Sequence, residues 1–253
     1  MIPELTELES REGVVEKNVS ESVDWGQRAR EGFLASGIDP ADRRGHKNFY
    51  IDLLQKSALE EVLELKGDET VLDFGCGSGR MAYWIAPRAK KVIGLEGTPQ
   101  MIQLAQQNRK SENVEFIHYD GVHFPILQNR FDLIISVGVL QYMAGNILNK
   151  TISTLAQCLR RGGNVCLIEQ ASDNLNVPRP KVKDYLQGFG EAKLECLKHY
   201  PIRNGRWWLL YLIRYGMIPE KWFLKIARYE LNKRRGERDF IRSYKDYLFL
   251  LRK

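Results

Sequence analysis

The stretch from Val71 to Arg80 constrains the fold of this chain more than any other. Its sequence, Val-Leu-Asp-Phe-Gly-Cys-Gly-Ser-Gly-Arg, places a short apolar run before three glycines at alternate positions. Such an apolar run is typical of a strand that is buried on both faces of a parallel sheet. The glycines let the backbone turn sharply and let a ligand approach closely, because they carry no Cβ atom. A helical pattern follows, so the stretch predicts a ligand cradle at the carboxyl end of a strand.

Further apolar runs alternate with helical patterns along the chain. A helical face begins at Asn48 and is ended by Gly67, and a second is expected over residues 141–159, followed by a turn at 160–163. Strands separated by helices at short spacing predict an α/β fold with a doubly wound parallel sheet and right-handed crossovers. The predicted strands cover residues 69–74, 90–96, 113–120, 131–137, 164–169, 193–200 and 244–251.

Composition narrows the class of protein. Hydrophobic residues make up 43% of 253 residues, which is enough for a packed core. No run approaches the roughly 18 apolar residues of a membrane span, and the amino terminus lacks the pattern of a secretory signal. The four cysteines are scattered without metal-type spacing and are expected to be reduced thiols, so we expect a cytoplasmic protein without a metal site.

The glycine spacing separates two classes of cofactor. A dinucleotide cradle has the pattern Gly-x-Gly-x-x-Gly and holds a pyrophosphate at the helix amino terminus. Here the pattern is Gly-x-Gly-x-Gly, and Asp73 precedes the first glycine by two positions. A carboxylate beside a pyrophosphate would repel it, whereas a carboxylate beside a cationic or amine-bearing ligand would stabilise it. The loop therefore favours a cofactor with a positive centre.

Two more acids end predicted strands. Glu96 ends the second strand, where a carboxylate can accept hydrogen bonds from both ribose hydroxyls. Asp120 ends the third strand, where it can accept from the exocyclic amine of adenine. S-adenosylmethionine carries all the matching groups: a sulfonium, an α-amine, a ribose diol and an adenine amine.

These residues together resemble a known family. Residues 73–79, Glu96, Asp120 and the run 131–134 look like the successive motifs of class I S-adenosylmethionine-dependent methyltransferases of the small-molecule type. The resemblance covers residues 48–170, about half of the chain. It implies a Rossmann-like sheet of seven strands, mostly parallel, in which the seventh strand is antiparallel and lies beside the sixth.

The resemblance also implies a set of cofactor-binding residues. The glycine loop would hold the methionine moiety, the end of the second strand the ribose, and the end of the third strand the adenine. Residues after the fourth strand would lie beside the sulfonium. In full, the implied residues are Asp73, Gly75, Cys76, Gly77, Glu96, Gly97, Met101, Asp120, Gly121, Val137 and Tyr142.

Methyl transfer from a sulfonium depends mainly on in-line placement of the nucleophile, although a hydroxyl acceptor would also benefit from a general base. The candidates are His123, Gln141, Tyr142 and His199, with positioning favoured over proton transfer for Gln141 and Tyr142. The fourth strand is followed by Val-Gly-Val rather than by the Pro-Pro motif that grips amide or base nitrogens in related enzymes. We therefore expect transfer to an oxygen or nitrogen of a small molecule, such as a sugar, a lipid or another metabolite that can be anionic. The alternatives are RNA methylation and a non-catalytic module that binds S-adenosylmethionine.

Four segments are expected. Residues 1–47 form an arm or lid, 48–200 the cofactor-binding core, 201–243 a basic and aromatic helical insertion, and 244–253 the last strand. Residues 201–253 contain 14 Lys and Arg against 5 Asp and Glu. The insertion is expected to be a substrate cap, with solvated charges or with cations that bind an anionic acceptor. A membrane-surface contact and, less favoured, a nucleic-acid face remain alternatives, and the oligomeric state stays open.

Overall fold

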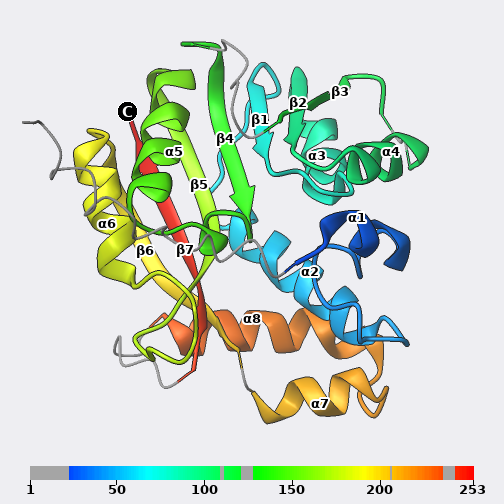
Figure 1. Cartoon of the computed structure of the whole chain (residues 1–253). Coiled ribbons are helices and arrows are strands. Elements are labelled where there is room, and N and C mark those ends of the chain that lie inside the picture. Colours follow the sequence, from blue (N-terminus) through cyan, green and yellow to red (C-terminus); the bar gives the residue numbers. More distant parts are fainter. Residues whose placement is uncertain (1–22, 109–110, 121–127, 206, 236–242) are drawn as a thin grey trace, which may run out of the picture.

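The chain folds around one seven-stranded sheet (Figure 1). A computed structural model describes residues 23–108, 111–120, 128–205, 207–235 and 243–253. The strand order is β3-β2-β1-β4-β5-β7-β6, and β7 is antiparallel to both of its neighbours while the other adjacent pairs are parallel. This confirms the predicted α/β class and the antiparallel last strand. The strands are β1 Thr70–Phe74, β2 Lys91–Glu96, β3 Val114–His118, β4 Phe131–Val137, β5 Leu159–Ala171, β6 Glu195–Asn204 and β7 Lys245–Arg252.

Helices cover both faces of the sheet (Figure 1). One apolar core joins the sheet to α2, α3 and α8 through residues such as Tyr50, Ile85 and Phe223. A second core joins the other face to α5 and α6 through Ile152 and Tyr185. The helices are α1 Trp25–Arg28, α2 His46–Glu60, α3 Arg80–Ile85, α4 Pro99–Gln107, α5 Gly145–Cys158, α6 Val182–Glu191, α7 Trp208–Arg214 and α8 Phe223–Arg234, with 3₁₀ turns η2 Ala29–Glu31, η3 Ala86–Arg88, η4 Leu140–Tyr142 and η5 Glu220–Trp222.

The pleat of β1 decides which side chains reach the ligand end of the sheet. Successive side chains of a strand point to opposite faces. Val71 therefore packs in the core beside α2 and α3, whereas Leu72 and Phe74 pack in the core beside α5 and α6. By the same alternation Asp73 lies on the face of Val71, and its side chain is 2% exposed.

The predicted turn at 160–163 is wrong, because these residues belong to β5. Phe131 on β4 pairs with Leu159, and Leu133 pairs with Asn164, so 160–163 form a bulge opposite a single residue. Gly162 has a φ of +79°, and a Cβ atom on Gly163 would lie 3.0 Å from the carbonyl oxygens of Arg160 and Asp132. The two glycines allow the extra residues to fit inside the strand.

The helix expected over 141–159 begins later than predicted. Leu140–Tyr142 form the 3₁₀ turn η4, and α5 begins only at Gly145, whose φ is +52°. The left-handed backbone at Gly145 interrupts the helical path. Residues 138–144, between β4 and α5, are therefore outside the helix and can line the carboxyl end of the sheet.

The insertion packs beside α2 rather than over the carboxyl ends of β1 and β2. Helices α7 and α8 both contact α2, and α8 also contacts β6. The Tyr50 hydroxyl on α2 donates a 2.8 Å hydrogen bond to Glu230 on α8 beneath the surface. In Figure 1 the two helices lie together at the bottom of the view. Among the described residues, no helix combines the length and the apolar character that crossing a membrane requires.

Candidate active site

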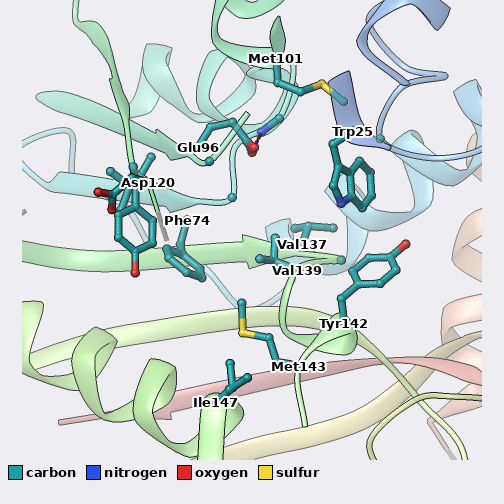
Figure 2. A pocket seen from close by; sticks show the side chains of 17 residues that line it. Trp25, Phe74, Glu96, Met101, Asp120, Val137, Val139, Tyr142, Met143 and Ile147 are labelled. Carbon is teal, nitrogen blue, oxygen red and sulfur yellow. Dashed lines mark hydrogen bonds between the residues drawn. The ribbon is translucent and has the colours of Figure 1, made fainter. Parts of the chain in front are cut away.

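A cavity of about 390 Å³ opens at the carboxyl ends of β1, β2, β3 and β4 (Figure 2). We call it the strand-end cavity. Figure 2 shows Trp25 and Tyr142 on one side of it and Asp120 on the other. Its lining contains two carboxylates, those of Glu96 and Asp120, and no Lys, Arg or His within the part of the chain that the structure describes. The predicted cofactor residues in its wall are Gly75, Gly77, Glu96, Gly97, Met101, Asp120, Val137 and Tyr142.

The glycine loop is shaped by close backbone approaches. Gly75 has a φ of +67°, and a Cβ atom there would lie 2.3 Å from Cγ2 of Val139. The amides of Gly75 and Cys76 both donate to the carbonyl oxygen of Leu95, at 2.7 and 3.1 Å. Gly77 has a φ of +52°, and a Cβ atom there would meet no heavy atom of the described residues within 4 Å, so its backbone faces open space. The loop is therefore locked at Gly75 and accessible to a ligand at Gly77.

Glu96 connects the glycine loop to the start of α4. One carboxylate oxygen accepts from the amide of Gly77 and the other from the amide of Thr98, both at 2.9 Å. These two bonds fix the carboxylate at the cavity wall with lone pairs to spare. A vicinal diol such as a ribose could donate to it there.

Asp73 lies beside the glycine loop but is not in the lining of the strand-end cavity. The pleat turns its carboxyl toward α3, where the backbone amide of Ala82 donates to it. Burial raises the pKa of Asp73 to about 7, partly offset by the nearby Arg80 guanidinium. Its Oδ2 atom is buried without a hydrogen-bond partner among the described residues, and the contact with methionine that the family resemblance implies stays a prediction.

Cys76 also lies outside the cavity wall. Its thiol is buried against Gly94, since a Cβ atom on Gly94 would lie 2.8 Å from Sγ. Burial and the nearby carboxylates of Asp73 and Glu96 raise its pKa well above the usual value. The thiol is therefore kept protonated, and its predicted role in cofactor binding stays a prediction.

Two predicted residues, Gly121 and His123, lie outside the described residues. His199 is described but is far from the chemistry in the fold, because it sits on the edge strand β6. Its ring stacks on Phe249 with centroids 6.3 Å apart, and it lines neither the strand-end cavity nor the chamber described below. The structure therefore does not bring His199 together with the other predicted site residues.

A buried acid that the sequence interpretation did not select supports the wall after β4. Glu169, at the end of β5, accepts from the amides of Val139 and Gln141 at 3.2 and 3.0 Å. Burial raises the pKa of Glu169 to about 8, against the effect of these donors. The available signal was an acid directly following the apolar run 165–168, where a strand core otherwise excludes charge.

The described part of the amino-terminal arm contributes Trp25 and Gly37 to the cavity lining. Trp25 meets Tyr142 edge to face with centroids 5.4 Å apart, and the Ser78 hydroxyl of the glycine loop donates a 2.6 Å bond to the carbonyl oxygen of Phe33. The described part of the arm thus contacts both sides of the site. Gly138 and Val139 lie in the segment after β4 that was expected beside the sulfonium, and the cavity residues that sequence interpretation missed are Trp25, Gly37, Phe74, Leu95, Tyr119, Met143 and Ile147.

A smaller polar chamber of about 90 Å³ adjoins the strand-end cavity. The two share Gly37, Val137, Gly138 and Tyr142 in their walls. Beyond these residues the chamber extends toward the ends of β5, β6 and β7. It is lined there by polar groups that include Gln55, Gln141, Gln170, Arg203, Tyr244 and Asp246.

The charges around the polar chamber are paired. Arg203 and Asp246 form a buried ion pair at 2.8 Å, and Lys47 pairs with Asp39 at 2.6 Å. Arg80 pairs with Asp52 at 2.9 Å. The Gln141 amide oxygen accepts from the backbone amide of Gln170 at 2.9 Å. The chamber therefore offers hydrogen bonds without a large excess of either charge.

The strand-end cavity suits S-adenosylmethionine better than a dinucleotide. A pyrophosphate would need compensating cations or several amides, whereas the described lining offers two carboxylates. Those carboxylates complement a ribose diol and an amine, and they favour a sulfonium electrostatically. When bound, this cofactor would supply an electrophilic methyl group.

Comparison with known proteins agrees with this site. Residues 71–163 match a family model described as a methyltransferase domain. A methyltransferase of Anoxybacillus flavithermus is 28% identical over 159 residues, covering 62% of this chain and 74% of that protein. The 18S rRNA (guanine-N(7))-methyltransferase of Schizosaccharomyces pombe is 27% identical over 132 residues, covering 47% of this chain and 49% of that protein.

Solved structures share the fold. The complex of the Haloferax volcanii Trm112 methyltransferase activator with a methyltransferase matches with a TM-score of 0.63 at 17% identity, covering 90% of this chain and 97% of the matched chain. Geranyl diphosphate C-methyltransferase from Streptomyces coelicolor, solved with S-adenosyl-L-homocysteine, matches with a TM-score of 0.58 at 14% identity and 78% coverage of each chain. The domain match and the relatives therefore identify the chain as a methyltransferase, and its seven-stranded sheet is the fold of solved S-adenosylmethionine-dependent methyltransferases.

Proposed function

We propose that this methyltransferase transfers its methyl group to an oxygen or nitrogen of a small polar molecule bound in the polar chamber. The observation that carries the proposal is the shared wall between the chamber and the strand-end cavity, formed by Gly37, Val137, Gly138 and Tyr142. Where the two spaces meet along these residues, an acceptor in the chamber would lie directly beside the methyl group of a cofactor in the strand-end cavity. Holding two reactants in line can contribute roughly 7–11 kcal/mol to a reaction of this kind.

The cofactor is assigned to the strand-end cavity in this proposal. Glu96 accepts from the ribose hydroxyls, Asp120 accepts from the adenine amine, and the backbone at Gly77 borders the methionine moiety. The carboxylate of Glu96, already oriented by the amides of Gly77 and Thr98, supports this assignment. Met101 and Gly97 supply wall contacts beside the adenosine.

The lining of the chamber favours an uncharged or zwitterionic acceptor over a strongly anionic one. Its cations Arg203, Lys47 and Arg80 are paired with Asp246, Asp39 and Asp52, so a phosphate would have to displace an existing partner. Buried pairs of this kind are costly to break. The amides of Gln141 and Gln170 can instead orient hydroxyl, amine or carbonyl groups of the acceptor.

Positioning is the role proposed for Gln141 and Tyr142. Gln141 is held by Glu169 through its backbone and by Gln170 through its side chain. Tyr142 is held between Trp25 and the guanidinium of Arg179, which lies 4.8 Å from its ring centroid.

In the reaction, the acceptor lone pair forms the new bond to the methyl carbon while the bond to sulfur breaks and leaves a neutral thioether. No His lines either space among the described residues, so the proton acceptor is not assigned.

RNA methylation is a second candidate, because the Schizosaccharomyces pombe relative acts on 18S rRNA. The test is to incubate the protein with methyl-labelled S-adenosylmethionine and a cell extract separated into small-molecule, RNA and protein fractions. We expect label in the small-molecule fraction, and we expect Gln141→Leu to reduce that labelling while retaining cofactor affinity. Label confined to RNA would favour the second candidate. If Gln141→Leu labels the small-molecule fraction as strongly as the wild type does, binding of the acceptor in the polar chamber is contradicted.

A further inference from the structure

Most of the exposed large apolar side chains gather on one part of the molecule. Of nine such side chains in the described residues, seven lie between Trp208 and Tyr229. Trp208 is 67% exposed and Met217 is 68% exposed, so they are not edges of the core. A concentration of this kind marks an interaction site more often than scattered apolar residues do. The seven residues are Trp208, Tyr211, Tyr215, Met217, Trp222, Leu224 and Tyr229.

Basic residues are interleaved with these apolar side chains. Lys221, Lys225, Arg228 and Lys233 are exposed on η5 and α8. The Nζ atom of Lys225 lies 5.3 Å from the ring centroid of Trp222, and that of Lys233 lies 5.9 Å from the ring centroid of Tyr229. Among the described residues of 207–235, Glu220 is the one exposed acid, and it pairs with His46 at 3.1 Å. We call these seven apolar and four basic residues the aromatic–basic surface.

We propose that the aromatic–basic surface docks on an anionic lipid bilayer. Trp and Tyr favour the membrane–water interface because their rings are apolar and their polar atoms remain hydrated. Lys and Arg beside them are attracted to anionic head groups while their aliphatic stems cover apolar surface. The described helices are too short to span the membrane, so α7, η5 and α8 would lie on its surface.

The composition favours a bilayer over other occupants. The centres of protein–protein interfaces are depleted in Lys, whereas Lys supplies three of the five exposed cations in the described part of residues 207–235. A nucleic acid would use the cations and could stack on the aromatic rings. It would leave the exposed aliphatic side chains of Met217 and Leu224 without a complementary partner, while an acyl-chain boundary accommodates them.

Hydrogen bonds join the aromatic–basic surface to residues 39–47, a segment whose two ends line the polar chamber. The guanidinium of Arg44 donates a 2.6 Å bond to the carbonyl oxygen of Tyr215, and that of Arg214 donates to the carbonyl oxygen of Ala41. Asp39 and Lys47, at the two ends of that segment, line the chamber. Docking would therefore bring the chamber side of the molecule to the membrane. The proposal concerns binding to lipid and does not depend on the identity of the methyl acceptor.

The test is co-sedimentation of the full chain with vesicles of phosphatidylcholine alone or mixed with phosphatidylglycerol. We expect binding to the mixed vesicles, weakened more than about tenfold by the double change Lys225→Glu and Lys233→Glu, since each basic residue at an anionic surface contributes appreciably. Trp208→Ala combined with Tyr211→Ala should weaken binding at least as strongly. All four side chains are exposed, so circular dichroism melts should remain those of the wild type.

Matched controls sit elsewhere on the surface. Lys150→Glu makes the same charge change on α5, and Leu175→Ala removes an apolar side chain that is 88% exposed in another loop. Both should bind vesicles like the wild type. Absence of binding to the mixed vesicles, or equal loss in the controls, would overturn the proposal. Binding of an RNA oligonucleotide that is lost in the Trp208 and Tyr211 variant, or a dimer in sedimentation analysis that this variant dissociates, would also overturn it in favour of another occupant.

Discussion

The carboxylate of Glu169 accepts a 3.0 Å hydrogen bond from the backbone amide of Gln141 and thereby ties the end of β5 to the wall after β4. A second bond from the amide of Val139, at 3.2 Å, fixes the other end of the same turn. Gly138 and Tyr142 of this segment line both the strand-end cavity and the polar chamber. A buried acid thus supports the place where the methyl group and the acceptor would meet.

The pH dependence of stability should report on this acid. Burial raises the pKa of Glu169 from 4.5 to about 8, so between these pH values the folded chain holds a proton that the unfolded chain releases. The resulting stabilisation is complete below about pH 4.5 and is lost as the pH rises to about 8. Gln at this position does not titrate. The free energy of unfolding of the wild type relative to Glu169→Gln should therefore fall across this window, by up to about 1.4 kcal/mol per pH unit.

Urea denaturation at several pH values measures this difference, in which other titrating groups cancel. Glu195→Gln, a change at an exposed carboxylate on β6, is the matched control and should follow the wild type. A difference between wild type and Glu169→Gln that is constant with pH would show that the buried carboxyl keeps its usual protonation.

Gly75→Ala should destabilise the fold through a steric conflict. The added Cβ atom would lie 2.3 Å from Cγ2 of Val139 on a backbone with a φ of +67°. The backbone strain costs about 1–2 kcal/mol, and the overpacking adds about 1–3 kcal/mol. Gly67→Ala is the control, because its φ is +96° but no described atom lies within 4 Å of the new one. Equal unfolding free energies for the two variants would contradict the close approach of Val139.

Much of the core was predictable from the sequence, because a short run of apolar residues by itself indicates a strand that is buried on both faces. The apolar runs that became β1, β2 and β4 are buried on both faces, and the acid Glu96 stands at a strand end as expected. The direction of the Asp73 side chain follows from the pleat of the strand that carries it. The alternation of side chains, which is readable from Val71, directs this acid toward α3, and its contact with the methionine moiety stays a prediction.

The remaining features depend on contacts between distant segments. Trp25 reaches Tyr142, and Gly37 lines both the strand-end cavity and the polar chamber, although the arm has little periodicity in sequence. The ion pair of Arg203 with Asp246 arises from the register of β6 on β7, which no local pattern specifies. The position of the 201–243 insertion also depends on distant contacts, because the apolar faces of its described helices pack beside α2, and its role as a substrate cap stays a prediction.

Trp25→Ala should weaken binding of S-adenosylhomocysteine roughly twofold to tenfold, the range expected from loss of an aromatic pair. Trp25 lines the strand-end cavity and orients Tyr142. Trp25→Phe keeps a ring at this position and should restore most of the affinity. Trp222→Ala, on the aromatic–basic surface, should bind like the wild type when measured by calorimetry. Wild-type affinity in Trp25→Ala would indicate that the arm does not close over the ligand.

Calorimetric titration of S-adenosylhomocysteine into the wild type and into Glu96→Ala tests whether the strand-end cavity binds the cofactor. Glu115→Ala on β3 is the control, since that carboxylate pairs with Lys91 at the surface and lies outside the cavity lining. Losing hydrogen bonds to a charged carboxylate costs about 1.5–3 kcal/mol. We therefore predict binding to the wild type and to Glu115→Ala, and affinity weakened roughly tenfold to a hundredfold in Glu96→Ala. No heat with the wild type, or unchanged affinity in a folded Glu96→Ala variant, would contradict the assignment of the strand-end cavity to this cofactor.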